Sequence, residues 1–243
     1  GAGGLSMTPA WSTEGDRNNA YLGQSVAGAG DVNGDGYADI VIGANNYDGE
    51  GRAWVYFGAP SGISPTPPWT ARPDQSNAQF GFSVSSAGDI NGDGYADVII
   101  GSRDYYDNYY REGRAFVYNG SAAGPASTPS WWADSNQDYA YFGWSVASAG
   151  DVNGDGYADV IVGSWHYANG QAHEGRAFLY YGNGGGGLDR TPRQARSDDT
   201  APVDLLGKSD SQTAFRLKVR GRSPAGRDSF GESFGYFGAF MRF

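Results

Sequence analysis

One segment of this chain occurs three times, and a repeat at this spacing constrains the fold more than any other feature. The copies read "AGDVNGDGYADIVIGA" at 29–44, "AGDINGDGYADVIIGS" at 87–102 and "AGDVNGDGYADVIVGS" at 149–164. Successive copies begin 58 and then 62 residues apart. A unit of this size that recurs in register predicts an array of similar structural modules.

Each unit predicts four short strands. A Thr-Pro pair and a tryptophan (Trp11, Trp69 or Trp131) open the unit, and a "GxSVxxAG" segment, the acidic loop, an "IVIGA"-like run and a "GRAFVY"-like run follow. These are short runs of β-forming residues bounded by Gly, Pro and Asn. Four strands in about 60 residues are typical of a β-propeller blade. We therefore predict an all-β protein with three blades in an incomplete ring, at about 4–61, 62–123 and 124–183.

Other fold classes and membrane insertion are disfavoured by the sequence. No stretch of 10–12 residues keeps a helical period, and the longest apolar runs, of four or five residues, are too short to span a membrane. The chain has no cysteine, which excludes disulfides, thiolate metal sites and thiol catalysis. A secreted protein without disulfides needs another source of stability, and bound metal ions are one.

Charge divides the chain into two parts. Residues 1–187 carry 7 basic and 20 acidic residues, whereas residues 188–243 carry 10 basic and 7 acidic ones. The acidic body argues against nucleic acid as a partner, because phosphate binding needs a basic surface. We expect 184–243 to be a divergent segment, either a partial blade or a strand-forming extension, in which 213–221 alternates like a strand. The run "NGGGG" at 183–187 predicts a flexible joint before it.

The acidic loops predict metal sites. Side-chain oxygens stand at positions 1, 3, 5 and 9 of each loop, and Asn-Gly and Asp-Gly steps let the backbone curl so that they converge. The backbone carbonyl at position 7 should turn inward as well. An oxygen-only set with several carboxylates suits Ca²⁺ better than Zn²⁺ or Cu²⁺. The predicted ligands of three Ca²⁺ ions are Asp31, Asn33, Asp35, Tyr37 and Asp39; Asp89, Asn91, Asp93, Tyr95 and Asp97; and Asp151, Asn153, Asp155, Tyr157 and Asp159.

These loops differ from an EF-hand, in which a bidentate Glu stands at position 12. Here that position holds Ile42, Ile100 or Val162, and the chain enters a strand directly after position 9. Asp, Asn and Gly are also good turn formers, but turn formation does not explain three neighbouring carboxylates in each of three loops. We therefore expect calcium sites of weak to moderate affinity.

The repeat resembles a known family. The pairs Phe80-Gly81 and Phe142-Gly143 (Leu22-Gly23 in the first copy), the "DxNGDGxxD" loop and the following "IVIGA" are similar to the FG-GAP repeats of integrin α-subunit propellers and their bacterial relatives. The resemblance covers about 4–183 and implies a β-propeller, seven-bladed in integrins, with Ca²⁺ in hairpin loops on one face. It implies no single function, since such propellers bind proteins or sugars, or are attached to enzymes.

Catalytic motifs are weak, and we predict a protein that is not an enzyme. His166 and His173 lie in one predicted loop without a third zinc ligand, and we expect them to be exposed loop residues. "GESFG" around Ser233 matches the G-x-S-x-G pattern, but no histidine follows it in the chain.

The aromatic residues of the variable loops are the better indication of function. These loops differ among the repeats while their flanks do not, which suits protein or glycan binding on a fixed scaffold. The alternative is that the same side chains pack between blades, and the sequence leaves both readings open. The residues concerned are Tyr105, Tyr106, Tyr109, Tyr110 and Trp165. Trp11, Trp69 and Trp131 recur in register and are expected in the core.

We predict an extracellular or cell-surface, calcium-binding propeller module that acts in binding, adhesion or as a scaffold. The alternatives are a carbohydrate-binding lectin and an accessory domain of a larger secreted hydrolase. Three blades are fewer than the four to eight that close a propeller. The open blade ends therefore predict either a piece of a longer propeller or self-association with other chains.

Overall fold

The structure is a computed structural model, and it describes residues 4–183, 193–195, 215–223 and 226–234. Apart from one short 3-10 turn, η1 (Tyr47–Gly49), its regular elements are strands. The all-β prediction is confirmed. The described part of the chain holds no helix of the length and apolar character that a membrane crossing requires.

Each repeat forms an antiparallel sheet. The first sheet has the order β1-β2-β3-β6, the second β7-β8-β9-β10 and the third, within the described residues, β11-β12-β13. A small hairpin of β4 (Gly58–Ala59) and β5 (Gly62–Ile63) follows β3. The strands of the three sheets are β1 (Leu22–Gly30), β2 (Asp39–Ala44), β3 (Arg52–Tyr56) and β6 (Trp69–Ala71); β7 (Phe80–Gly88), β8 (Asp97–Ser102), β9 (Arg114–Tyr118) and β10 (Trp131–Asp134); and β11 (Phe142–Gly150), β12 (Asp159–Ser164) and β13 (Arg176–Tyr180).

The tryptophan strands occupy a different place from the one that the sequence suggests. The sequence puts each of them in the repeat that it opens, but β6 pairs with β3 and β10 with β9, so each completes the preceding sheet. Trp69 lies opposite Val55, and Trp131 lies opposite Val117. Each outer strand therefore ties one repeat to the next, because its chain continues into the following sheet.

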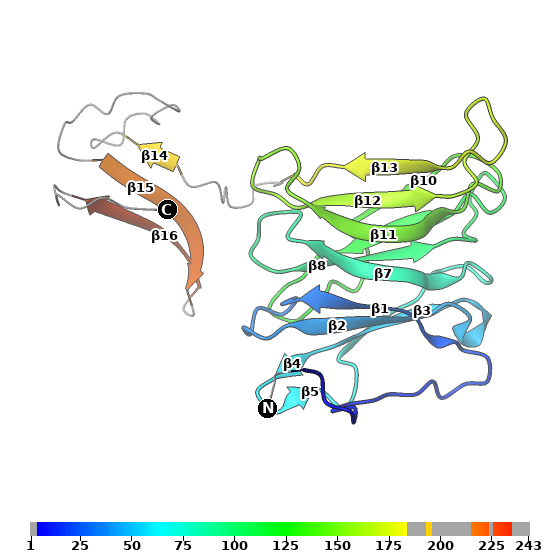
Figure 1. Cartoon of the computed structure of the whole chain (residues 1–243), viewed down its shortest axis with the longest axis horizontal. Coiled ribbons are helices and arrows are strands. Elements are labelled where there is room, and N and C mark those ends of the chain that lie inside the picture. The colour runs from blue at the N-terminus through cyan, green and yellow to red at the C-terminus, as the bar shows by residue number, and fades with distance from the viewer. Residues whose placement is uncertain (1–3, 184–192, 196–214, 224–225, 235–243) are drawn as a thin grey trace.

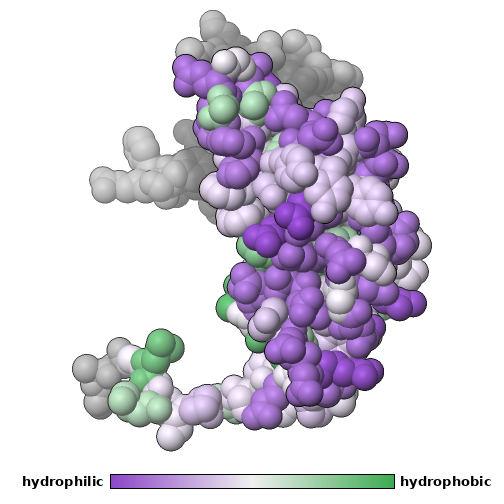
Figure 2. Space-filling view, turned by 90° about the vertical axis from the view of Figure 1, so that its right-hand side faces the viewer, coloured by the Kyte–Doolittle hydropathy of each residue, from purple (hydrophilic) through white to green (hydrophobic). Residues whose placement is uncertain are grey.

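The three sheets stack face to face, with their first strands against one another (Figure 1). One core cluster joins the first and second sheets through Val41, Val55, Phe80 and Val98, and a second cluster joins the second and third. Of the three tryptophans predicted in the core, Trp69 is buried and its indole N–H donates to the carbonyl of Ala126 at 3.0 Å, whereas Trp11 and Trp131 are only half-buried. Viewed end-on in Figure 2, the repeats form a crescent with separated ends and no closed ring.

Two glycines explain how closely neighbouring sheets approach. A Cβ placed on Gly43 would lie 2.0 Å from the carbonyl oxygen of Gly81, and one on Gly101 would lie 2.1 Å from that of Gly143. Backbone meets backbone at these points, so no side chain fits there. The "G" of the "IVIGA" run is thus required by the next sheet, and at Gly101 also by Ser83 of its own sheet, whose Oγ would lie 2.3 Å from the Cβ.

The C-terminal segment contains a separate sheet, β14-β15-β16, which lies apart from the stacked repeats in Figure 1. Its strands are β14 (Arg193–Ala195), β15 (Phe215–Ser223) and β16 (Gly226–Phe234). The strand predicted at 213–221 is confirmed by β15. Ser233 lies inside β16, so the "GESFG" match is part of a strand and not a strand–turn–helix elbow. The joint predicted at 183–187 falls outside the described residues, apart from its first residue.

Candidate functional site

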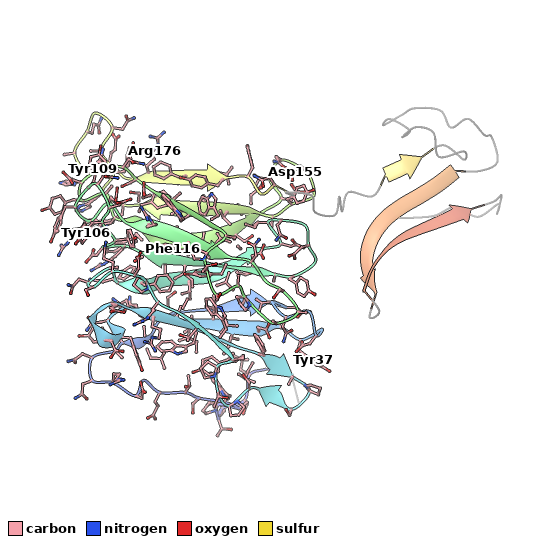
Figure 3. The ribbon with its side chains drawn as sticks, turned by 180° about the vertical axis from the view of Figure 1, so that it is seen from behind. Tyr37, Tyr106, Tyr109, Phe116, Asp155 and Arg176 are labelled. Atoms are coloured by element: carbon pink, nitrogen blue, oxygen red, sulfur yellow. The ribbon has the colours of Figure 1, made fainter. Side chains whose placement is uncertain are left out.

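The three acidic loops lie together at one end of the stacked sheets. Each loop joins the first strand of its sheet to the second, for instance β1 to β2 around Tyr37. Figure 3 shows Tyr37 and Asp155 at this end, and Tyr106 and Tyr109 at the opposite end of the strands. The molecule therefore has an end with nearly invariant acidic loops and an end with variable loops.

Within a loop, the first aspartate organises the turn. In the first copy Asp31 accepts hydrogen bonds from the backbone N–H of Asp35 at 3.0 Å and of Gly36 at 2.9 Å. Asp35 accepts from the N–H of Tyr37 at 2.9 Å and from the side-chain amide of Asn33 at 3.0 Å. The same bonds recur in the second and third loops. Hydrogen bonds therefore link positions 1, 3 and 5 within one small turn.

The aspartate at position 9 has a structural role that the sequence did not reveal. Asp97 is fully buried and accepts from the N–H of Ile90 at 2.9 Å and from that of Gly120 at 2.8 Å. The equivalent aspartates, Asp39 and Asp159, make the same pair of bonds. Each of them fastens the acidic loop to the segment after the third strand, 19 or 23 residues away in the chain.

The buried aspartates of the loops have raised pKa values. Burial raises the pKa of Asp97 to about 7, and the negative charges of Asp89 and Asp93 raise it as well. Burial likewise raises the pKa of Asp39. Within the described residues, no three His, Asp or Glu side chains gather around one point in a metal-ready arrangement. The donor set of carboxylate and amide oxygens fits Ca²⁺, and its crowded charges would be relieved by a cation.

Replacing Asp97 with Ala should destabilise the fold even without calcium. The change leaves the N–H groups of Ile90 and Gly120 buried without acceptors, at about 1–3 kcal/mol each. We expect the free energy of unfolding to fall by about 2–5 kcal/mol in urea titrations with chelator present. Asp93→Ala is the matched control, since its bonds stay within the turn, and it should cost about 1 kcal/mol under the same conditions. Equal losses for the two variants would contradict the structural role of position 9.

At the other end, the tyrosines of the second variable loop divide into two groups. Tyr105 is buried, packs edge-on against Phe116 at 5.6 Å and donates its hydroxyl to Asp74 at 3.1 Å. Tyr106, Tyr109 and Tyr110 are exposed. The packing alternative therefore holds for Tyr105 and in part for Tyr110, whose exposed ring also packs edge-on against Tyr139 at 5.2 Å, whereas Tyr106 and Tyr109 are available to a ligand.

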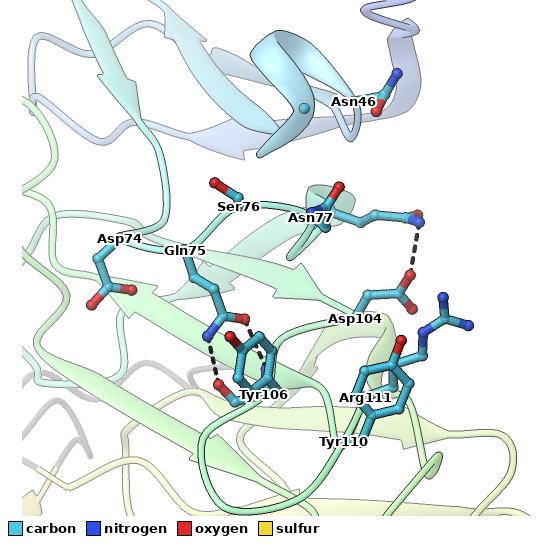
Figure 4. A pocket seen from close by; sticks show the side chains of 11 residues that line it. Asn46, Asp74, Gln75, Ser76, Asn77, Asp104, Tyr106, Tyr110 and Arg111 are labelled. Carbon is cyan, nitrogen blue, oxygen red and sulfur yellow. Dashed lines mark hydrogen bonds between the residues drawn. The ribbon is translucent and has the colours of Figure 1, made fainter.

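A cavity of about 600 Å³ opens beside these tyrosines, between the variable loops of the first and second sheets (Figure 4). Its polar wall includes Asp104, whose Oδ2 accepts from the amide of Gln79 at 2.8 Å. The Oδ1 of Asp104 is buried without a hydrogen-bond partner, and burial raises the pKa of this carboxyl. The variable loops predict a ligand site through their Tyr, Trp, Asn and Asp residues, whereas the glutamines of this wall carry no repeat pattern that would single them out. The side chains around the cavity include Asn46, Asp74, Gln75, Asn77, Gln79, Asp104, Tyr106, Tyr110 and Arg111.

The two histidines stack on each other and on a tryptophan. The ring centroids of His166 and His173 lie 4.3 Å apart, and those of Trp165 and His166 lie 3.7 Å apart. Burial, and the neighbouring His173, lower the pKa of His166. His173 is exposed, and no third metal-ligating side chain joins the pair among the described residues. This arrangement indicates a stacked loop and gives no support to a zinc centre.

The three repeats are similar in sequence to known proteins. The family model described as FG-GAP repeat matches 22–56, 80–118 and 142–180. Integrin alpha pat-2 of Caenorhabditis briggsae is 36% identical over 100 residues, which are 40% of this chain and 8% of that protein. Integrin alpha-E of Mus musculus is 29% identical over 160 residues, 63% of this chain and 13% of that protein. The chain thus spans only about a tenth of the length of the curated relatives that it matches.

Antiparallel sheets of four, four and three described strands, stacked in an arc and each with an acidic loop between its first two strands, define β-propeller blades. The matched segments coincide with the first three strands of each sheet. The chain contains three FG-GAP repeats, and they are similar to those of integrin α subunits.

Proposed function

We propose that this chain is an extracellular, calcium-stabilised and non-catalytic binding module of the adhesion type. The observation that carries the proposal is the division of the molecule into two ends (Figure 3). Three acidic loops with the same hydrogen bonds lie at one end, and loops of different sequence lie at the other. Loops of nearly the same sequence in every repeat suit the binding of a structural ion, and loops that differ in sequence suit the recognition of a particular ligand.

The calcium part of the proposal rests on donor chemistry. In each loop, the side chains at positions 1, 3, 5 and 9 and the carbonyl at position 7 would hold the ion, which would supply the positive charge that the clustered carboxylates need. In the second loop the ligands would be Asp89, Asn91, Asp93, Tyr95 and Asp97. An ion there would hold the turn shut beside the buried strand β8, whose first residue is Asp97.

The ligand part rests on the variable end. Tyr106 and Tyr110 offer exposed rings beside a cavity of about 600 Å³ lined by amides and carboxylates. Exposed tyrosines are common anchors of protein interfaces, so a protein ligand is the first candidate. The cavity favours a glycan as the second candidate, because its side-chain amides and carboxylates can hydrogen-bond hydroxyl groups while a ring stacks on the sugar.

A printed array of extracellular-matrix proteins and glycans, probed in millimolar Ca²⁺, tests the ligand end. We expect binding to one of the two classes, weakened at least about tenfold by Tyr106→Ala, because exposed anchor residues are worth about 1–2 kcal/mol or more. Tyr37→Ala is the matched control, since Tyr37 is exposed at the opposite end. Binding that is equally reduced by both variants, or unaffected by Tyr106→Ala, would overturn this assignment.

A further inference from the structure

The face of the third sheet that points away from the second sheet has the apolar residues of an inter-sheet contact, but among the described residues no sheet packs on it. Ile161 and Leu179 are 38% and 44% exposed there. Their counterparts in the second sheet, Ile99 and Val117, are 0% and 1% exposed because the third sheet packs on them. The third sheet therefore presents the same apolar positions that the first two sheets bury against a following neighbour.

The third sheet also keeps the glycines that a following sheet requires. A Cβ on Gly101 would meet the backbone of the next sheet, at the carbonyl oxygen of Gly143. Gly163 stands at the same position of the third sheet, where a Cβ would meet the Oγ of Ser145 at 2.4 Å, as one on Gly101 would meet that of Ser83 at 2.3 Å, but no atom of another sheet lies within 4 Å among its three nearest neighbours. At Gly150 a Cβ would meet nothing within 4 Å, whereas its counterpart Gly88 lies against the next sheet.

The face of the first sheet that points away from the second sheet has the residues that form the other side of such a contact. Val26 is 65% exposed, whereas its counterpart in the second sheet, Val84, is 5% exposed and packs on the first sheet. Gly23, with a φ of 88°, stands where Gly81 of the second sheet approaches the preceding sheet. The two ends of the arc therefore match each other as the two sides of an internal blade junction do.

The outer strand completes the correspondence. Trp69, in the outer strand of the first sheet, stacks on Tyr118 of the second at 5.1 Å. Trp11 stacks on Tyr56 of the first sheet at 4.9 Å in the same T-shaped geometry, yet residues 11–13 belong to no strand. The segment around Trp11 thus contacts the first sheet in the same way as the outer strand of the first sheet contacts the second.

The third sheet lacks that outer strand. Its edge strand β13 pairs only with β12 within the described residues. The chain's own next strand, β14, pairs with β15. An unpaired edge with free N–H and C=O groups is a ready site for strand addition.

We propose that two copies of this chain join head to tail and close a six-bladed ring. The third sheet of one copy packs on the first sheet of the other, and the Trp11 segment of the second copy pairs with β13. The register of the internal junctions places Trp11 opposite Leu179, and Thr13 opposite Ala177. The two junctions of the ring are equivalent, and a two-fold axis through the centre of the ring relates the two copies. Two copies give six blades, inside the range of four to eight, whereas three copies would give nine.

Light scattering and sedimentation of the 243-residue chain at micromolar concentration test the ring. We expect a species of twice the 25.7 kDa chain mass. Leu179→Asp should weaken the dimer by at least about tenfold per junction, hence about a hundredfold for a ring with two, because each junction would bury an unpaired charge. Tyr109→Asp is the control, since Tyr109 is exposed in the variable loop of the second sheet, which lies at neither end of the arc. A monomer, or an open polymer, for the unaltered chain would overturn the proposal.

Disulfide cross-linking tests the register independently of affinity. Because the chain has no cysteine, Thr13→Cys and Ala177→Cys introduce the only thiols. Mild oxidation of an equimolar mixture of the two single variants should give covalent heterodimers, since paired residues in antiparallel strands lie within disulfide reach. A mixture of Thr13→Cys with Tyr37→Cys should not. Equal cross-linking in both mixtures would mean that the contact is random and that the junction is wrong.

Discussion

Removing calcium should lower the melting temperature of this chain by on the order of 10 °C. Without the position-12 glutamate, a dissociation constant of about 0.1 mM is a reasonable magnitude for such loops. At about 1 mM Ca²⁺, each site then stabilises the fold by roughly 1.4 kcal/mol, or about 4 kcal/mol for three sites. For a chain of this size, 1 kcal/mol corresponds to about 2–4 °C in melting temperature. Thermal melts followed by circular dichroism with Ca²⁺ and with chelator measure the difference.

The variant Asp93→Ala shows whether the loops are the source of this effect. It removes the position-5 carboxylate of the second loop and leaves the other two loops intact, so calorimetry should count two ions in place of three. The shift in melting temperature should shrink by about a third, because each site contributes equally in this estimate. A melt that does not respond to chelator, or a count that stays at three, would contradict the calcium sites.

Gly101→Ala should be among the most damaging single substitutions in the chain. Its Cβ would lie 2.1 Å from the carbonyl oxygen of Gly143, and real Cβ atoms essentially never come within 3.0 Å of a neighbour. Because the contact is with backbone, the second and third sheets would have to separate. We expect the free energy of unfolding to fall by about 3 kcal/mol or more, or roughly 6–12 °C in melting temperature.

Two alanine variants serve as controls for this prediction. Gly28→Ala introduces its Cβ into open space and should change the stability by less than about 0.5 kcal/mol. Gly163→Ala occupies the position equivalent to Gly101 and would meet the Oγ of Ser145 at 2.4 Å, but among the described residues it meets no backbone of a following sheet, so it should cost less than Gly101→Ala. A Gly163→Ala monomer as unstable as Gly101→Ala would show that the glycine serves its own strand and not the neighbouring sheet.

The acidic loops and the strands around them could be predicted because their causes are local. Asn-Gly and Asp-Gly steps fix the turn, and the β-branched runs that follow fix the strand, within about sixteen consecutive residues. The bonds from Asp35 and Gly36 to Asp31 arise inside this segment. The same holds for the alternating stretch that became β15, which the sequence placed to within two residues at each end.

Residues whose role depends on a partner far along the chain could not be assigned in this way. In the sequence, Asp39 cannot be told apart from the other loop carboxylates. In the structure, it accepts a hydrogen bond from the backbone N–H of Gly58, just after the end of β3. Tyr105 and Tyr106 are adjacent in the same loop, yet the first is buried and the second is exposed, because only Tyr105 turns toward Phe116 and Asp74. Sequence gives no measure of which way either side chain faces.

The repeats, most of their strands and the turns of the acidic loops therefore follow from the sequence, since each depends on neighbouring residues. Only the tertiary structure decided which sheet each tryptophan strand completes, because strand pairing is made across dozens of residues. It also decided that Gly43 and Gly101 face the next sheet and that Gly163 has no such neighbour in its own chain. The physical reason is that a blade is locally encoded, whereas the junction between blades exists only once two of them are in contact.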